Sequence, residues 1–208
     1  MKRHNLLYLI IYISFITPCA LQAQERFTDQ YNVSYITMDD GLPHNFIDDI
    51  YKDTRGFLWI STAGGGLSRY DGYEFIHFNP NTSHCKLKSN FILNVYEDTF
   101  QRLWIVSEGG TDIIDLLTLQ PIIPNDPKGL LTILLNQPAY TVIRDSQNSI
   151  WLQCGNALHR ITFNTKGDVE SLSTLKLPQL NEPDLVLKDI DEDGKIWTAI
   201  NGTIYKII

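Results

Sequence analysis

Residues 47–71 read IDDIYKDTRGFLWISTAGGGLSRYD, and the tryptophan of this stretch recurs along the chain at a constant spacing. The four tryptophans, Trp59, Trp104, Trp151 and Trp197, lie 45, 47 and 46 residues apart. Each follows an aspartate by six residues, and these aspartates are Asp53, Asp98, Asp145 and Asp191. A period in the mid-forties is the length of one four-stranded β-propeller blade. The repeat therefore predicts an all-β chain of about four blades, each of roughly 46 residues.

The aspartate of each repeat predicts a tight turn between two strands. An aspartate at the start of a turn accepts a hydrogen bond from the backbone two residues further on, and glycine three residues later supplies a positive φ. Gly56 and Gly194 fit this pattern, whereas Gln101 and Asn148 replace the glycine in the second and third repeats. Asparagine tolerates a positive φ more readily than glutamine does.

The strand that carries each tryptophan is apolar on consecutive residues, as in Leu58-Trp59-Ile60 and Ile150-Trp151-Leu152. A sheet with one wet face does not need this pattern, whereas a strand buried on both faces does. We therefore interpret the tryptophans as packing between neighbouring blades, and not as a platform for a ligand. The fourth repeat departs from the pattern at Lys188, which replaces the apolar residue nine positions before the tryptophan.

Residues 47–71 resemble the two-component regulator propeller repeat, with its pattern I-x-x-I-x-x-D-x-x-G-x-L-W-I-x-T-x-x-G-G-L-x-R-Y-D. Residues 35–45 are similar to the Asp-Gly-Leu-Ser-x-Asn lead-in of the same family, with Pro43 in place of the serine. The resemblance covers residues 27–208 and implies the periplasmic sensor region of a hybrid two-component system. It implies no ligand-binding residue, because the matched positions form the blade framework.

The N-terminus has the three-part layout of a secretory signal peptide. Lys2 and Arg3 precede an apolar run over residues 6–16, and small residues before Gln24 predict cleavage after Ala23. The run is too short for a membrane-spanning helix of about 20 residues. Lipidation at Cys19 is the alternative, although the preceding proline does not suit it. The mature chain is therefore expected to be exported to the periplasm, with no membrane span in this segment.

The charge of the mature chain excludes one class of partner. Without residues 1–23, it has 15 lysines and arginines against 24 aspartates and glutamates, a formal charge of −9. Such a surface repels phosphate backbones, so nucleic acid is not expected as a partner. Cys85 and Cys154 lie at different places in their repeats, which favours two unpaired or buried thiols over a disulfide.

No group of residues predicts catalysis, a cofactor or a metal. Asp191–Gly194 faintly resembles an acidic calcium-binding loop. The remaining ligand spacing and the terminal glutamate of such a loop are absent, so a hairpin turn is expected. Gly64–Gly66 is expected to be a blade turn, because the Gly-Lys-Ser/Thr sequence of a phosphate-binding loop is absent. The remaining candidates, all without metal-ligand spacing, are His44, His77, His84 and His159.

Residues 121–138 form the largest irregularity in the repeat. Prolines interrupt the pattern, and residues 130–135 form a short apolar run. We expect this segment to contain the outer strand of the second repeat and the first strand of the third. A loop of this kind at a propeller face is a place where a binding site could form.

The repeat gives the following predicted organisation: a signal peptide (1–23), a lead-in (24–40), blade repeats 41–86, 87–133 and 134–180, and an incomplete fourth repeat (181–208). Residues 26–37 are expected to supply the outer strand that closes the last blade of a ring. Residues 205–208 fall in the third strand of the fourth repeat. Four repeats are few for this repeat type, so an incomplete or open propeller is expected.

The function that the resemblance implies is reception of a signal, with a ligand derived from oligo- or polysaccharide breakdown. Its other expected partners are the remaining blades or another copy of the chain. No kinase domain lies in these residues, so no enzymatic activity is expected of them. Two alternatives remain open: an exported interaction or scaffold protein, and a propeller lyase or hydrolase.

Overall fold

The computed structural model describes residues 33–176, 186–200 and 203–207. The predicted signal peptide, its cleavage site and Cys19 lie outside these residues. Residues 1–36 and residues 37–208 are two separate units, and residues 33–36 of the first contain no regular element. Residues 33–37, the described part of the predicted closing strand, form no strand. In the second unit, the short 3-10 helix η2 (Met38–Asp40) precedes the first sheet.

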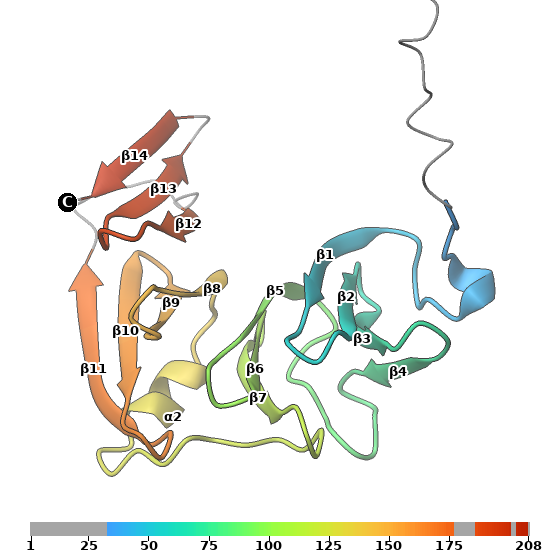
Figure 1. Ribbon diagram of the computed structural model, residues 1–208, viewed down its shortest axis with the longest axis horizontal. Helices are drawn as coiled ribbons and strands as arrows, with labels where there is room; N and C mark the ends of the chain where they lie inside the picture. Colours follow the sequence, from blue (N-terminus) through green and yellow to red (C-terminus); the bar gives the residue numbers. More distant parts are fainter. Residues whose placement is uncertain (1–32, 177–185, 201–202, 208) are drawn as a thin grey trace, which may run out of the picture. The chain divides into compact units, whose positions relative to one another are not determined.

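The four repeats form four antiparallel sheets, which confirms the all-β propeller prediction (Figure 1). Blade 1 contains β1 (Ile47–Lys52), β2 (Leu58–Thr62), β3 (Gly66–Tyr70) and β4 (Phe75–Phe78). Blade 2 contains β5 (Ile92–Glu97), β6 (Arg102–Ser107) and β7 (Gly110–Asp115). Blade 3 contains β8 (Thr141–Arg144), β9 (Ile150–Cys154), β10 (Ala157–Phe163) and β11 (Val169–Lys176). Blade 4 contains β12 (Val186–Ile190), β13 (Ile196–Ile200) and β14 (Thr203–Ile207).

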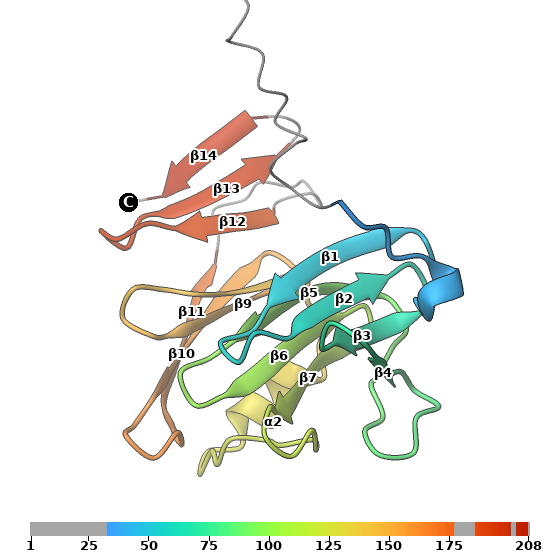
Figure 2. The ribbon, with the colours of Figure 1, turned by 45° about the vertical axis from the view of Figure 1, so that its right-hand side comes forward.

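Consecutive blades meet through their first strands. Strand β1 contacts β5, β5 contacts β8, and β8 contacts β12. Figure 2 shows the strands of each blade in chain order, from the first strand outward. Because the hairpins within a blade are short, the sequence repeat becomes a repeat of stacked sheets.

The core lies between the sheets. Trp59 of β2 packs with Ile92, Val95 and Ile105 of blade 2 in one buried cluster. Trp104 packs with blade 3 residues in a second cluster, and Trp151 packs against a third cluster formed with residues of blade 4. The tryptophan of each of these blades therefore faces the following blade.

Blade 4 accommodates Lys188 by a change of register. The pairing of β12 with β13 shifts between Leu187 and Asp189, so Lys188 lies in a β-bulge and is exposed. Leu187 pairs with Thr198 and is 2% exposed. Leu187 therefore occupies the buried position that the apolar residue nine before tryptophan occupies in the other blades. A β-bulge has this effect because its extra residue changes which face of the sheet the neighbouring side chains lie on.

The predicted strands in residues 121–138 were wrong. Residues 130–135 form the helix α2 (Leu130–Leu135), and blade 2 has only a single bridge, Ile114 with Pro121, where a fourth strand would lie. As a helix, the run buries one face, formed by residues at the helical spacing i, i+3 and i+4: Leu131, Leu134 and Leu135. Strand β8 begins only after this segment.

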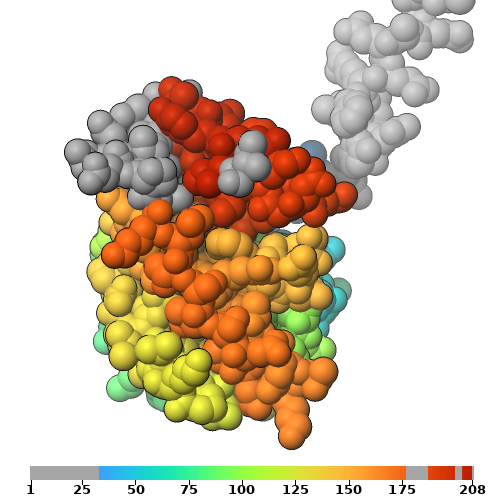
Figure 3. Space-filling view, turned by 90° about the vertical axis from the view of Figure 1, so that its left-hand side faces the viewer, coloured from blue at the N-terminus to red at the C-terminus, as the bar shows by residue number. Residues whose placement is uncertain are grey.

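The end of α2 is fixed to blade 2 by a lysine. The Nζ atom of Lys88 donates hydrogen bonds to the carbonyl oxygens of Thr111 and Leu135, both at 2.7 Å. The segment before α2 lies against β11, where Val169 N donates to Asn125 O at 2.9 Å. Figure 3 shows this segment in yellow beside the orange strand. No helix among the described residues is long and apolar enough to span a bilayer.

Candidate functional site

The aspartate and tryptophan of every repeat are joined by a hydrogen bond. In each blade the indole Nε1 donates to the aspartate Oδ2, at 2.8 Å for Asp53–Trp59, 2.9 Å for Asp98–Trp104, 2.9 Å for Asp145–Trp151 and 3.0 Å for Asp191–Trp197. The sequence reasoning assigned the aspartate to the turn and missed this bond. The constant separation of six residues was the signal that could have revealed it.

The other carboxylate oxygen of each aspartate holds the turn. Asp53 Oδ1 accepts hydrogen bonds from Arg55 N at 3.0 Å and Phe57 N at 2.9 Å. Asp98 and Asp145 bond their turns in the same way. The residues expected to have positive φ do so, with 95° at Gly56, 57° at Gln101, 64° at Asn148 and 78° at Gly194. One carboxylate thus orients both the turn and the tryptophan.

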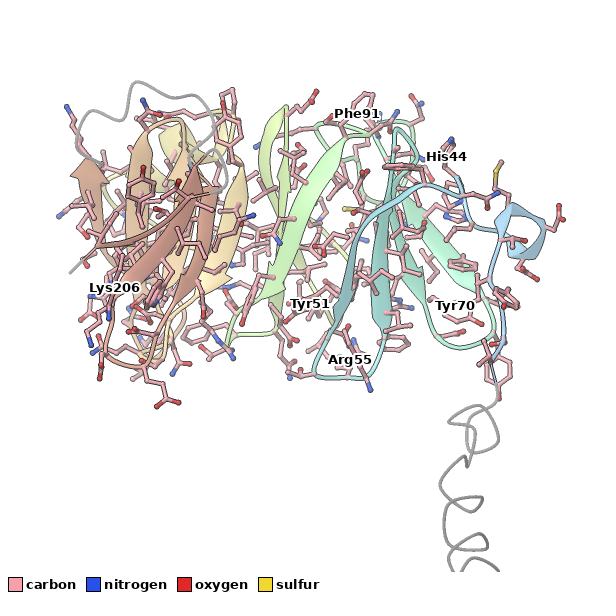
Figure 4. The ribbon with its side chains drawn as sticks, turned by 90° about the horizontal axis from the view of Figure 1, so that it is seen from above. His44, Tyr51, Arg55, Tyr70, Phe91 and Lys206 are labelled. Atoms are coloured by element: carbon pink, nitrogen blue, oxygen red, sulfur yellow. The ribbon has the colours of Figure 1, made fainter. Side chains whose placement is uncertain are left out.

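Buried polar side chains add bonds between blades 1 and 2. The Glu97 carboxylate, 2% exposed, accepts from Thr54 N at 2.7 Å and Thr54 Oγ1 at 2.6 Å. Glu97 N donates to the Tyr51 hydroxyl at 3.2 Å. Figure 4 shows Tyr51 and Arg55 at one edge of blade 1, while His44 and Phe91 lie at the opposite edge. We call the edge with Arg55 the turn edge, because it carries the first turn of each blade.

Arg102 connects blades 2 and 3 at the turn edge. Its Nε bonds Asp98 Oδ2 at 2.6 Å, and its Nη1 donates to Gly167 O at 2.7 Å. Its guanidinium lies over the rings of Phe100 and Phe163. Because Arg102 is 4% exposed and Asp98 is 2% exposed, this pair is a buried charge pair. Removing one partner of such a pair strongly destabilises the fold, because the other charge stays buried without compensation.

The histidines singled out in the sequence each contact a different neighbour within the fold. His77 Nδ1 bonds Ser68 Oγ at 2.9 Å, and His159 Nδ1 bonds Thr174 Oγ1 at 3.0 Å. Burial lowers the pKa of both imidazoles. His44 Nδ1 accepts from Phe46 N at 3.0 Å, whereas His84 packs its ring against Phe78.

The other candidate residues also have roles within the fold. Cys85 and Cys154 are buried free thiols in different clusters, and burial raises the pKa of each to about 11. Asp191 Oδ1 accepts from Lys195 N at 2.8 Å across the hairpin turn. A Cβ atom at Gly66 would lie 2.4 Å from Phe78 O, so the close approach of two strands requires glycine there. Among the described residues, no group of three or more metal-ligating side chains is present.

A groove at the turn edge of blade 3 is the candidate ligand site. A cavity of about 380 Å³ lies between the first turns of blades 2 and 3 and the third strand of blade 3. A second cavity, of about 160 Å³, lies between the first turns of blades 3 and 4. Gln147 and Arg160 line both cavities. We call the two cavities together the Arg160 groove. A concave site with convergent polar groups is a natural place for a ligand.

Arg160 is held in this groove by three neighbours. Its Nε donates to Ser149 Oγ at 3.0 Å, and its Nη2 donates to Gln147 Oε1 at 2.6 Å and lies 3.2 Å from Asp145 Oδ2. The guanidinium carbon lies 5.6 Å from the centroid of the Trp151 ring. These contacts fix one edge of the guanidinium and leave Nη1 for a ligand or water.

The irregular segment at residues 121–138, named above as a place where a binding site could form, adjoins a smaller cavity. About 130 Å³ lies between Asp126–Leu130 and β11, beside the yellow segment in Figure 3. Asp126 Oδ2 accepts from Leu131 N at 2.7 Å and so orients the start of α2. This carboxylate is therefore already used by the fold.

Comparison with known proteins identifies the repeat. The sequence model of the two-component regulator propeller matches residues 41–64. The extracellular domain of BT4673, assigned as a hybrid two-component system of B. thetaiotaomicron, has 26% identity and a TM-score of 0.60; the match covers 80% of this chain and 23% of that one. The extracellular domain of BT3049, assigned as a hybrid two-component system of the same organism, has 17% identity and a TM-score of 0.54, over 82% of this chain and 30% of that one.

A lyase of known structure has a similar fold. Virginiamycin B lyase from Staphylococcus aureus shares 14% identity over 77% of this chain and 55% of its own, with a TM-score of 0.52, so it shares the fold alone. A comparison with curated protein sequences gives no match.

The fold and the match therefore define a β-propeller segment whose residues 41–64 match the two-component regulator propeller, which confirms the resemblance stated from the sequence. The segment is related to the extracellular domain of BT4673, a protein assigned as a hybrid two-component system. It spans less than a third of the length of the two extracellular domains named above.

Proposed function

We propose that the chain is the signal-sensing propeller segment of a hybrid two-component system, exported to the periplasm and responsive to glycan breakdown products. The observation that carries this proposal is the 26% identity to the BT4673 extracellular domain over 80% of the chain. The signal peptide predicted for residues 1–23 supports export. The aspartates and tryptophans of the repeat serve the framework, so the ligand must bind elsewhere.

We further propose that these blades are part of a larger propeller, because two blade faces lack a neighbour. Ile50, Val95 and Val142 occupy the same position, opposite the residue that follows tryptophan. Val95 and Val142 are 1% and 0% exposed beneath the preceding blade, whereas Ile50 of blade 1 is 60% exposed. An apolar residue at a position that other blades bury marks an unfilled blade interface.

The far face of blade 4 gives the same result. Leu67, Leu158 and Ile204 each pair with the second residue after the tryptophan of their blade. Leu67 and Leu158 are both 0% exposed beneath the following blade, whereas Ile204 is 72% exposed. Further blades of the same repeat type would bury both Ile50 and Ile204.

The proposed function is tested in the source strain. We would read the genomic DNA beyond codon 208, delete the gene, and measure transcripts during growth on one polysaccharide at a time. The expected result is an in-frame continuation into more repeats and a kinase, with loss of induction on one class of glycan. A stop codon with no such sequence, together with unchanged induction on every glycan, would support the exported interaction protein instead.

A further inference from the structure

The Arg160 groove presents polar groups that the fold itself does not use. The Asn148 side chain, the Glu170 carboxylate and the Gln147 Nε2 atom line the larger cavity and have no partner among the described residues. The backbone of the turn, with a φ of 64° at Asn148, sets the direction of the Cα–Cβ bond of this residue. These groups come from the first turn of blade 3 and from β11, so the fold brings them together.

The charges of the groove restrict its ligand. Arg160 supplies a guanidinium and Glu170 supplies a carboxylate to the same cavity. Because Arg160 is already paired with Asp145, the carboxylate of Glu170 leaves the groove with a net negative charge, which disfavours an anionic ligand. A hydroxyl group both accepts a hydrogen bond from the guanidinium or an amide and donates one to the carboxylate. A neutral ligand with several hydroxyl groups therefore satisfies the whole set.

The larger cavity also has aromatic walls against which a sugar ring can pack. Phe100 and Phe163 contribute apolar surface beside the polar groups, and their rings are 5.8 Å apart in an edge-to-face arrangement. Arg102 beneath them fixes both rings. A sugar ring has both the hydroxyl groups and the apolar C–H surface that such a cavity matches.

We propose that the Arg160 groove is a binding site for a neutral sugar unit, with Arg160, Asn148 and Glu170 as its hydrogen-bonding residues. This inference rests on the proposed function and deepens it, because it places the ligand at the turn edge between blades 2 and 3. It also selects neutral over acidic saccharides.

The test is calorimetric titration of the mature chain with short oligosaccharides, one at a time: neutral gluco-, xylo-, manno- and galacto-oligosaccharides, and oligogalacturonate as the acidic probe. The variants are Asn148→Gly and Glu170→Ala. Asn148→Gly keeps the turn, because Gly56 and Gly194 occupy the equivalent position with positive φ. The control is Asn156→Ala, an exposed turn residue of blade 3 that does not line the groove.

The expected result is binding of at least one neutral oligosaccharide that weakens roughly tenfold in each groove variant, the size of one lost hydrogen bond, with no change in the control. Binding that is unchanged in both variants overturns this site and leaves the proposed function standing. Preference for oligogalacturonate, or no binding of any saccharide, also overturns the inference. The transcript experiment then decides the proposed function independently.

Discussion

At the scale of single residues, Asp98 is a framework side chain with four donors, one of them the guanidinium of a buried arginine. Its carboxylate accepts from the Phe100 and Arg102 amides, from the Trp104 indole and from the Arg102 guanidinium. The equivalent Asp191 in blade 4 accepts from Lys195 N and Trp197 but has no buried arginine partner. The same repeat position therefore differs in energy from one blade to another.

We predict that Asp98→Ala destabilises the chain by about 3–5 kcal/mol, because it leaves the Arg102 guanidinium buried without its partner. Asp191→Ala should cause a clearly smaller loss. Urea unfolding followed by tryptophan fluorescence measures both at equal protein concentration. Equal losses in the two variants would show that the Arg102 pair adds nothing to the framework.

Gln101 is the residue least suited to its backbone. It has a φ of 57°, a conformation that favours glycine, which two of the equivalent turns contain. We predict that Gln101→Gly stabilises the chain by about 0.5–1 kcal/mol, since the left-handed conformation costs L-residues energy. Asn148→Gly is the matched control and should give a smaller gain. A loss of stability in Gln101→Gly, seen as a lower urea midpoint, would contradict this reasoning.

The two half-buried histidines predict the response to acid. Burial lowers the pKa of His77 and His159 below the ordinary value of 6.5, so the unfolded chain binds protons first as the pH falls. Stability is therefore retained above pH 6.5 and declines below it. Asp71 and Asp115, whose pKa values are lowered mainly by backbone hydrogen bonds, act in a separate, more acidic range.

We expect the urea midpoint to fall between about pH 7.5 and about pH 5.5, since this range is close to the histidine pKa and above the carboxylate range. The double variant His77→Gln/His159→Gln should show a smaller fall. A variant with the same pH dependence as the wild type would assign the effect to other groups.

At the scale of elements, the bulge in β12 makes a sharp prediction. Leu187→Ala should cost about 2–5 kcal/mol, because it removes buried side-chain volume. Lys188→Ala should change stability by no more than about 0.5 kcal/mol, because Lys188 is exposed in the bulge. Both are measured by urea unfolding. A large loss in Lys188→Ala with a small loss in Leu187→Ala would mean that β12 pairs in the register of the other blades.

The elements show how far the sequence could predict the fold. Strands β2, β6 and β9 could be predicted from the apolar run around each tryptophan. A strand that is buried on both faces needs consecutive apolar residues, and each of these strands has them. Helix α2 did not follow, because a six-residue apolar run has no periodicity that separates a helix from a strand. The bulge at Lys188 did not follow either, since it compensates for a substitution that only the pairing of β12 reveals.

The candidate site was less predictable than the fold. Asn148 is recognisable in the sequence as a substitute for a turn glycine, but Arg160 and Glu170 lie on different strands at positions without a repeat pattern. Their convergence depends on how the first turn of blade 3 meets β10 and β11. Spacing along one chain does not contain that information.

At the scale of the whole molecule, the central claim is that the described blades are part of a larger array. Ile50 and Ile204 are exposed at positions where the inner blades bury apolar side chains. A repeat array gains much of its stability from contacts between neighbouring repeats, so an unfilled face is an association site. The claim concerns these two faces and does not depend on the identity of a ligand.

The most direct measurement is the mass of the mature chain, residues 24–208, by sedimentation over a range of concentrations. We predict concentration-dependent association that Ile50→Asp reduces, whereas Tyr73→Asp does not, although Tyr73 is 92% exposed in the turn between β3 and β4. A monodisperse monomer at every concentration, with one sharp cooperative unfolding transition, would contradict the account and indicate a self-sufficient four-bladed domain.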